Sequence, residues 1–123
     1  MNKSLIKEKS FQFALKIISF YRVLISENEF IISKQLLKSG TSIGANIEEA
    51  LAGQTKKDFI AKMSISSKEA RETKYWLRLL SESELTENDV SFLLDGIDEI
   101  IRMLTSIVKT SQKNLTKDLT LKT

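Results

Sequence analysis

The sequence contains no cysteine, no histidine and no proline, and these absences exclude several classes of protein. Without cysteine there are no disulfides and no thiolate sites, so a cytoplasmic location is the simplest expectation. Most zinc sites, Ser-His and Cys-His catalysis, and the Glu-x-x-His di-iron sites of helical bundles are also excluded. The absence of proline favours long uninterrupted helices. The start of the chain does not resemble a signal peptide, and no apolar run approaches transmembrane length, so no membrane partner is expected.

The chain has 123 residues, which is the length of one domain, and its composition is typical of a globular protein. The net charge is only +3, but the charges are unevenly placed along the sequence. Residues 53–78 carry about +4, whereas residues 79–104 carry about −6. A basic segment of this kind permits nucleic-acid binding without requiring it.

Four amphipathic segments have the apolar spacing of helices, and no segment alternates as a strand does. The predicted helices cover residues 3–25, 29–52, 56–81 and 87–111. Because short turns connect them, we expect an all-α, antiparallel up-down four-helix bundle that forms one domain over residues 1–123. Residues 112–123 are polar and have no clear apolar face, so this tail is expected to fray.

The helix ends are predicted from capping motifs. Three Ser/Thr residues precede an acidic residue by three positions at the expected helix starts: Ser26 with Glu29, Thr55 with Asp58, and Thr86 with Asp89. Gly53 is expected to end the second helix in a left-handed conformation.

The first helix carries apolar residues on more than one face, since Phe13 and Phe20 lie outside its two regular apolar rows. Such a helix has more surface to bury than one partner face provides. This pattern indicates an interface between subunits that includes Phe13 and Phe20. The alternative is a central helix that contacts two neighbours of its own chain.

The central part of the chain carries several motifs that resemble the 23S rRNA-intervening-sequence protein family. They are Gln35-Leu36, Ser42-Ile43-x-x-Asn46-Ile47-x-Glu49, Lys57-Asp58-Phe59 and Lys68-Glu69-Ala70-x-Glu72-Thr73-x-Tyr75-Trp76-Leu77. The resemblance covers about residues 10–110. This chain departs from many members of the family at Lys38, Ala50 and Ser66.

The resemblance implies a small cytoplasmic bacterial protein that assembles as a ring-like homopentamer. It also implies kinship with the accessory proteins of diversity-generating retroelements, which bind nucleic acid and a reverse transcriptase through a basic surface. For most members of the family no molecular role is implied. The resemblance therefore supports the fold and the assembly more strongly than it supports a function.

A set of polar residues on the second and third helices invites a chemical interpretation. The set consists of Ser42, Asn46, Glu49, Glu69 and Glu72. Paired carboxylates can bind a metal or act as acid and base, but the sequence supplies no nucleophile, phosphate cradle or nitrogen ligand beside them. We therefore expect a structural polar network, within the bundle or between subunits, with no catalytic residue, metal or cofactor.

Basic residues recur along one side of the third helix. This basic stripe consists of Lys57, Lys68, Arg71, Lys74 and Arg78. Repeated around a ring, these cations would attract phosphate groups, and Tyr75 or Trp76 could stack on bases. Alternatively, the stripe is an ordinary solvated face, with its cations interleaved with Glu69 and Glu72 or paired with the acidic fourth helix of a neighbouring subunit, and Trp76 belongs to the core.

The sequence thus favours a non-enzymatic homopentamer that associates with RNA or DNA, or that acts as an adaptor for a protein partner. The alternative is a structural or protein-interaction module that binds no nucleic acid. An enzyme that uses the clustered carboxylates is the third and least favoured hypothesis.

Overall fold

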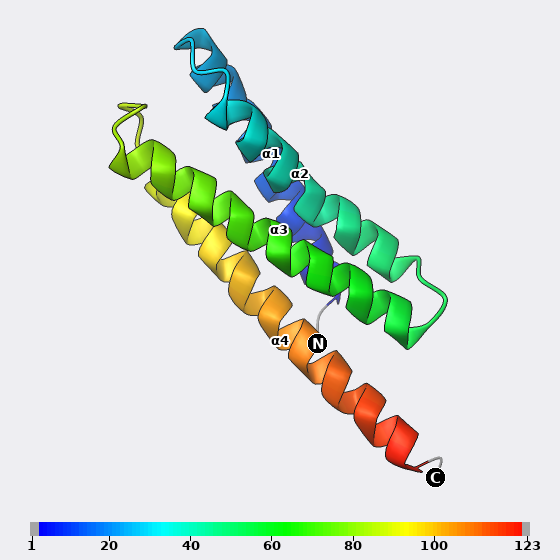
Figure 1. Cartoon of the computed structure of the whole chain (residues 1–123). Coiled ribbons are helices and arrows are strands. Elements are labelled where there is room, and N and C mark those ends of the chain that lie inside the picture. The colour runs from blue at the N-terminus through cyan, green and yellow to red at the C-terminus, as the bar shows by residue number, and fades with distance from the viewer. Residues whose placement is uncertain (1–2, 122–123) are drawn as a thin grey trace.

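A computed structural model of the chain describes residues 3–121 and shows four helices connected by short turns (Figure 1). The helices are α1 (Lys3–Ser26), α2 (Ile32–Leu51), α3 (Lys56–Glu82) and α4 (Ser91–Leu121). Consecutive helices run in opposite directions, and each packs against two others, with α1 and α4 the least closely packed pair. The described residues form no strand, which confirms the predicted all-α class. None of these helices is apolar over a stretch long enough to cross a membrane.

A single apolar core draws on all four helices. The residues that recur at helical spacing from Val90 to Ile107 are buried, and so are those of α3 from Met63 to Leu80. In α1, however, the buried row differs from the two predicted ones. It consists of Ile6, Ser10, Phe13, Ile17, Phe20 and Leu24. This row steps by four and three, so α1 has one regular inward face. It includes Phe13 and Phe20, which the sequence prediction placed outside the apolar rows of this helix.

Small and hydroxyl-bearing residues bring α2 close to its neighbours. The Ser66 hydroxyl on α3 donates to the Ile43 carbonyl at 2.8 Å, and the Thr73 hydroxyl donates to Ser39 Oγ at 2.9 Å. A Cβ atom placed on Gly40 would lie 2.9 Å from Cγ2 of Ile17 on α1. The cost of glycine inside a helix is therefore offset by close packing.

The start of α2 differs from the predicted capping motif. Ser26 is the last residue of α1, and its hydroxyl donates to the Val23 carbonyl at 2.6 Å instead of capping the next helix. The cap is the Glu29 carboxylate, which accepts hydrogen bonds from the N–H groups of Ile31, Ile32 and Ser33 at 3.3, 2.9 and 2.6 Å. Acidic side chains suit this position because the free N–H groups at a helix start carry partial positive charge.

The Glu29 cap leads to a pH-dependent prediction. Partial burial raises the pKa of Glu29, but the hydrogen bonds from Ile32, Ser33 and Ile31 outweigh it and hold the pKa below its usual value. A group whose pKa is lower in the folded state stabilises the fold above its unfolded pKa of about 4.3 and loses that contribution as the pH falls. Replacing Glu29 with alanine should therefore cost about 1 kcal/mol at neutral pH.

Urea unfolding of the parent protein and of Glu29→Ala, at pH 7 and again at pH 3, measures this effect. The difference between the two proteins should shrink at pH 3. A difference that is the same at both pH values would contradict the assignment of Glu29 as an ionised cap.

The other helix ends follow the prediction in part. Thr55 caps α3, since its hydroxyl accepts from the Asp58 N–H at 3.0 Å. The fourth helix starts at Ser91, later than predicted, because the Asp89 carboxylate accepts the Ser91 N–H at 2.9 Å. Gly53 does not adopt the expected left-handed conformation; the described residues with positive φ are Asn28 and Glu84, in the other two turns.

The segment predicted to fray is helical, since α4 continues to Leu121. Its last turns extend past the α2–α3 turn (Figure 1). Leu115 lines a hollow with Ile60 and Ala61 of α3, and Lys56 pairs with Asp118. These contacts with the first turns of α3 provide the packing that the sequence pattern did not reveal. Residues 122–123 lie outside the described part of the chain.

Candidate nucleic-acid interface

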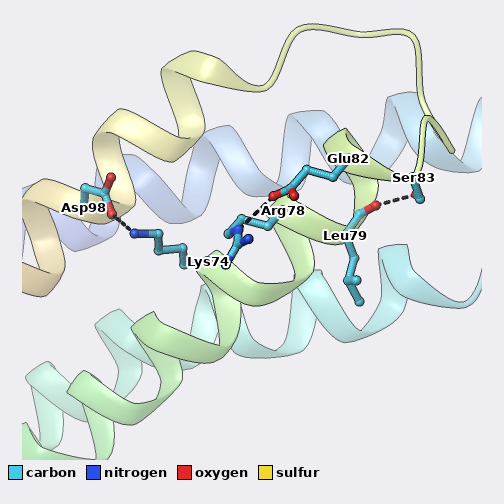
Figure 2. A network of polar contacts seen from close by, with 6 residues as sticks. All are labelled: Lys74, Arg78, Leu79, Glu82, Ser83 and Asp98. Carbon is cyan, nitrogen blue, oxygen red and sulfur yellow. Dashed lines mark hydrogen bonds and ion pairs between the residues drawn. The ribbon is translucent and has the colours of Figure 1, made fainter.

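The basic stripe predicted on α3 divides into two parts in the structure. In the part nearest the α3–α4 loop, Lys74 pairs with Asp98 of α4 at 2.8 Å, and Arg78 pairs with Glu82 at 2.8 Å (Figure 2). The hydrogen bond and the charge of Arg78 hold the pKa of Glu82 below its usual value. Asp98 of α4 thus neutralises one of the five predicted cations, Lys74, within the chain, and Glu82 of α3 itself neutralises a second, Arg78.

The other three cations, Lys57, Lys68 and Arg71, are exposed and make no ion pair with any residue between 3 and 121. Arg71 donates to the Thr105 hydroxyl on α4 at 3.3 Å. This bond holds the Arg71 side chain over the seam between α3 and α4 while leaving its charge without a carboxylate partner.

Two adjoining hollows between α3 and α4 receive these three cations, and we call them together the α3–α4 groove. The hollows have volumes of about 450 and 320 Å³, and both are lined by Gln112. The remaining polar lining residues are Lys57 and Thr116 in the first hollow, and Ser64, Ser67, Lys68, Arg71, Thr105 and Lys109 in the second. Neither lining contains a carboxylate, so the groove combines positive charge with neutral hydrogen-bonding groups.

Sequence reasoning missed the α4 side of this groove. Thr105, Lys109, Gln112 and Thr116 recur at intervals of four, three and four residues, which is the spacing of one helix face. The spacing is visible in the sequence, but the expectation that residues 112–123 fray assigns Gln112 and Thr116 to no helix face. The helical continuation of α4 is what gives these residues a common face.

The predicted polar network does not form within one chain. Asn46 Nδ2 donates to the Ser42 carbonyl at 2.9 Å, and the Ser42 hydroxyl donates to the Lys38 carbonyl at 2.7 Å, so both bonds stay within α2. Glu49 forms an ion pair with Lys62 at 3.3 Å, and Glu72 is exposed. Ser42 and Asn46 are held by carbonyl groups of their own helix, and Glu49 and Glu72 are exposed, so the five side chains do not converge. Their role between subunits stays a prediction.

Glu69 is the most perturbed of the predicted carboxylates. Partial burial is the larger cause that raises the pKa of Glu69, and the negative charge of Glu72 raises it further. The positive charge of Lys38 partly opposes this shift. Within residues 3–121 no three histidine, cysteine or acidic side chains lie close enough together to hold a metal ion.

Phe13 and Phe20, the residues predicted for a subunit interface, lie in the core of the chain, although Phe20 also lines the α1–α4 groove defined below. Only 4% of Phe13 and 6% of Phe20 is exposed, because both belong to the inward row of α1. The apolar residues that α1 and α4 leave exposed are others, among them Leu15 and Phe92, at 45% and 54%. These two line a hollow of about 420 Å³, the α1–α4 groove, together with Val23 and the rim residues Lys16 and Asp89.

The two adjacent aromatic residues of α3 have different environments. Tyr75 is 55% exposed, whereas Trp76 packs against the core, and its buried Nε1 has no hydrogen-bond partner. Their rings meet edge to face with centroids 5.1 Å apart. The expectation that Trp76 belongs to the core therefore agrees with the structure, and Tyr75 is the aromatic ring that remains available for stacking.

The chain is similar in fold and in sequence to a protein of known structure. A crystal structure of a protein of unknown function from the S23 ribosomal protein family of Bacteroides thetaiotaomicron VPI-5482 superposes with a TM-score of 0.84. The two sequences are 45% identical, and the match covers 89% of this chain and 99% of that one. The search of curated proteins finds no relative of this chain. The model of the 23S rRNA-intervening sequence protein family matches residues 2–106. The chain therefore belongs to the 23S rRNA-intervening sequence protein family.

Proposed function

We propose that this protein is a non-enzymatic, cytoplasmic homo-oligomer that associates with the phosphate backbone of RNA or DNA through α3. The observation that carries the proposal is the trio of Lys57, Lys68 and Arg71, which lie exposed on one side of α3 without ion pairs among the described residues. Cations that are free of carboxylate partners bind phosphate and release the counterions condensed on it. The proposed function is binding alone and involves no chemical reaction.

Assembly would multiply this charge. The α1–α4 groove exposes Leu15, Val23 and Phe92 side by side, which is the kind of apolar surface that a second copy of the chain covers. A closed ring built from such contacts repeats the α3 cations once per subunit. The ring-like homopentamer implied by the family resemblance is the assembly we propose.

The competing function is a structural or protein-interaction module. The pairs Lys74 with Asp98 and Arg78 with Glu82 favour it, since they show that acidic residues neutralise part of the stripe. Under this alternative, Lys68 and Arg71 would be neutralised in the same way by a neighbouring subunit. The two functions therefore differ in what happens when the charges of Lys68 and Arg71 are reversed.

The double variant Lys68→Glu, Arg71→Glu is expected to lose retention on immobilised RNA at low salt while keeping the oligomeric mass of the parent. Both side chains are exposed, so the fold should not change. Gel filtration with light scattering and RNA retention measure the two properties together. Loss of the oligomer with no RNA binding by the parent protein would instead support the interaction module.

A further inference from the structure

We infer that the ligand of the α3–α4 groove is single-stranded nucleic acid, laid along the seam of the two helices with one base stacked on Tyr75. The inference rests on the proposed function. It adds the route that the nucleic acid takes, the requirement for a single strand, and the residues of α4 that line the site opposite α3. It rests on the lining of the groove, on the exposure of Tyr75 and on the ion pairs that bound the groove at both ends.

The groove has the charge and length of a backbone site. Four cations line it, Lys57, Lys68 and Arg71 from α3 and Lys109 from α4. From Lys57 to Arg71 the helix rises about 21 Å. The hydroxyl and amide groups between the cations donate to phosphate or sugar oxygens without adding charge. A chain of several phosphates fits this arrangement better than a single small anion does.

Ion pairs mark both ends of the groove. Beyond Arg71, Lys74 is neutralised by Asp98 of α4. At the other end, Lys56 is neutralised by Asp118, also of α4. Glu72 follows Lys68 by four residues but is not part of the lining. The cations at the two ends of the groove are therefore neutralised, whereas the four that line it are not.

The shape of the seam favours one strand over two. The axes of packed helices lie about 8–10 Å apart, whereas a B-DNA duplex is wider than its major groove, which alone measures about 12 Å across. A duplex therefore touches only the rims, whereas a single backbone can enter. Entry brings the phosphates close to Arg71 and to the hydroxyl groups of Ser64 and Thr105.

Tyr75 adds a contact that requires an unpaired base. It follows Lys68 by seven residues and therefore lies on the same face of α3, near the end of the groove that Arg71 lines. The edge-to-face contact with Trp76 fixes the orientation of the ring. Stacking on an exposed aromatic ring tolerates any base, but the bases of a duplex are already stacked on each other.

The test measures binding of a labelled 12-nucleotide single strand and of the matching duplex by fluorescence anisotropy at low salt. Three variants are compared with the parent protein. The groove variant is Lys68→Gln with Lys109→Gln, the control variant is Lys74→Gln with Arg78→Gln, and the stacking variant is Tyr75→Ala. The groove variant and the control variant each lose two positive charges. The groove variant loses them from α3 and α4 inside the groove, and the control variant loses them from α3 outside it.

We expect the parent to bind the single strand about tenfold or more tightly than the duplex. The groove variant should lose about tenfold in affinity, and the control variant less than about threefold. The stacking variant should lose about tenfold on the single strand and almost nothing on the duplex. Each expected change appears as a shift in the midpoint of the binding curve.

Equal losses in the groove and control variants, or equal affinity for single strand and duplex, would overturn the inference while leaving the proposed function standing. If the parent binds neither ligand, the proposed function fails as well. Tighter binding of an acidic polypeptide such as polyglutamate than of the single strand would also overturn the inference, because it would identify the groove as a docking surface for a protein.

Discussion

Replacing Gly40 with leucine is expected to destabilise the fold by about 3 kcal/mol or more. A Cβ atom at this position already lies 2.9 Å from Cγ2 of Ile17 and 3.0 Å from Cγ1, which is closer than van der Waals contact allows. Ile17 is branched at Cβ and fully buried, so it has little freedom to move aside. The added side chain would therefore force α1 and α2 apart, which is the costly form of overpacking.

Gly44 provides the matched control, since it lies one turn later on the same helix. A Cβ atom there would be 3.4 Å from the Ser10 hydroxyl oxygen, which is ordinary contact. Gly44→Ala should therefore be neutral or gain up to about 1 kcal/mol from the higher helix propensity of alanine. Chemical denaturation of both variants tests the pair. A Gly40→Leu protein as stable as the parent would show that α1 and α2 do not approach as described.

The double variant Leu15→Glu, Phe92→Glu is expected to convert the proposed homo-oligomer into folded monomers. Both side chains are exposed in the single chain and line the α1–α4 groove, so the substitutions leave the core intact. In an oligomer that buries this groove, two carboxylates would lose their hydration without gaining partners. Light scattering at micromolar concentration should change from about five times the 14.0 kDa chain mass to one.

Phe13→Ala is the contrasting variant, because Phe13 lies within the core. It should cost about 3–5 kcal/mol of folding stability, through the cavity that it leaves. The comparison separates an effect on assembly from an effect on folding. If the Leu15 and Phe92 variant keeps the parent's mass, the assembly does not use the α1–α4 groove.

The sequence predicted the helices well because their apolar rows are regular. The row from Val90 to Ile107 and the row from Met63 to Leu80 both face the core. In α1 the same method chose the wrong rows, because apolar residues on several faces offer more than one register. The inward face of α1 instead passes through Ser10, a small polar residue that is buried beside Gly44.

Helix ends were harder to predict because several residues compete for each capping role. Ser26, Glu29 and Ser33 all have suitable side chains, and which of them caps α2 depends on where α1 ends. The continuation of α4 to Leu121 has a similar origin. Residues 112–121 are mostly polar, and their helix depends on tertiary contacts such as the pair of Lys56 with Asp118, which no local pattern encodes.

The α3 side of the candidate site was predicted from the sequence, whereas the pairing of its charges was not. The α3 cations share a face, and helical spacing alone places them together. Whether each charge is free depends on α4, where Asp98 meets Lys74 and Thr105 meets Arg71. Such pairings depend on the register between the two helices, so they emerged only with the structure.

The most direct test of the central claim, that free cations on α3 bind the nucleic-acid backbone, is the salt dependence of binding by the unaltered protein. The affinity for a single-stranded oligonucleotide should be measured from low to physiological salt. If the four cations of the α3–α4 groove each contact a phosphate, a plot of log K against log salt should have a slope of about −3. A slope near zero, or no binding at low salt, would contradict the account.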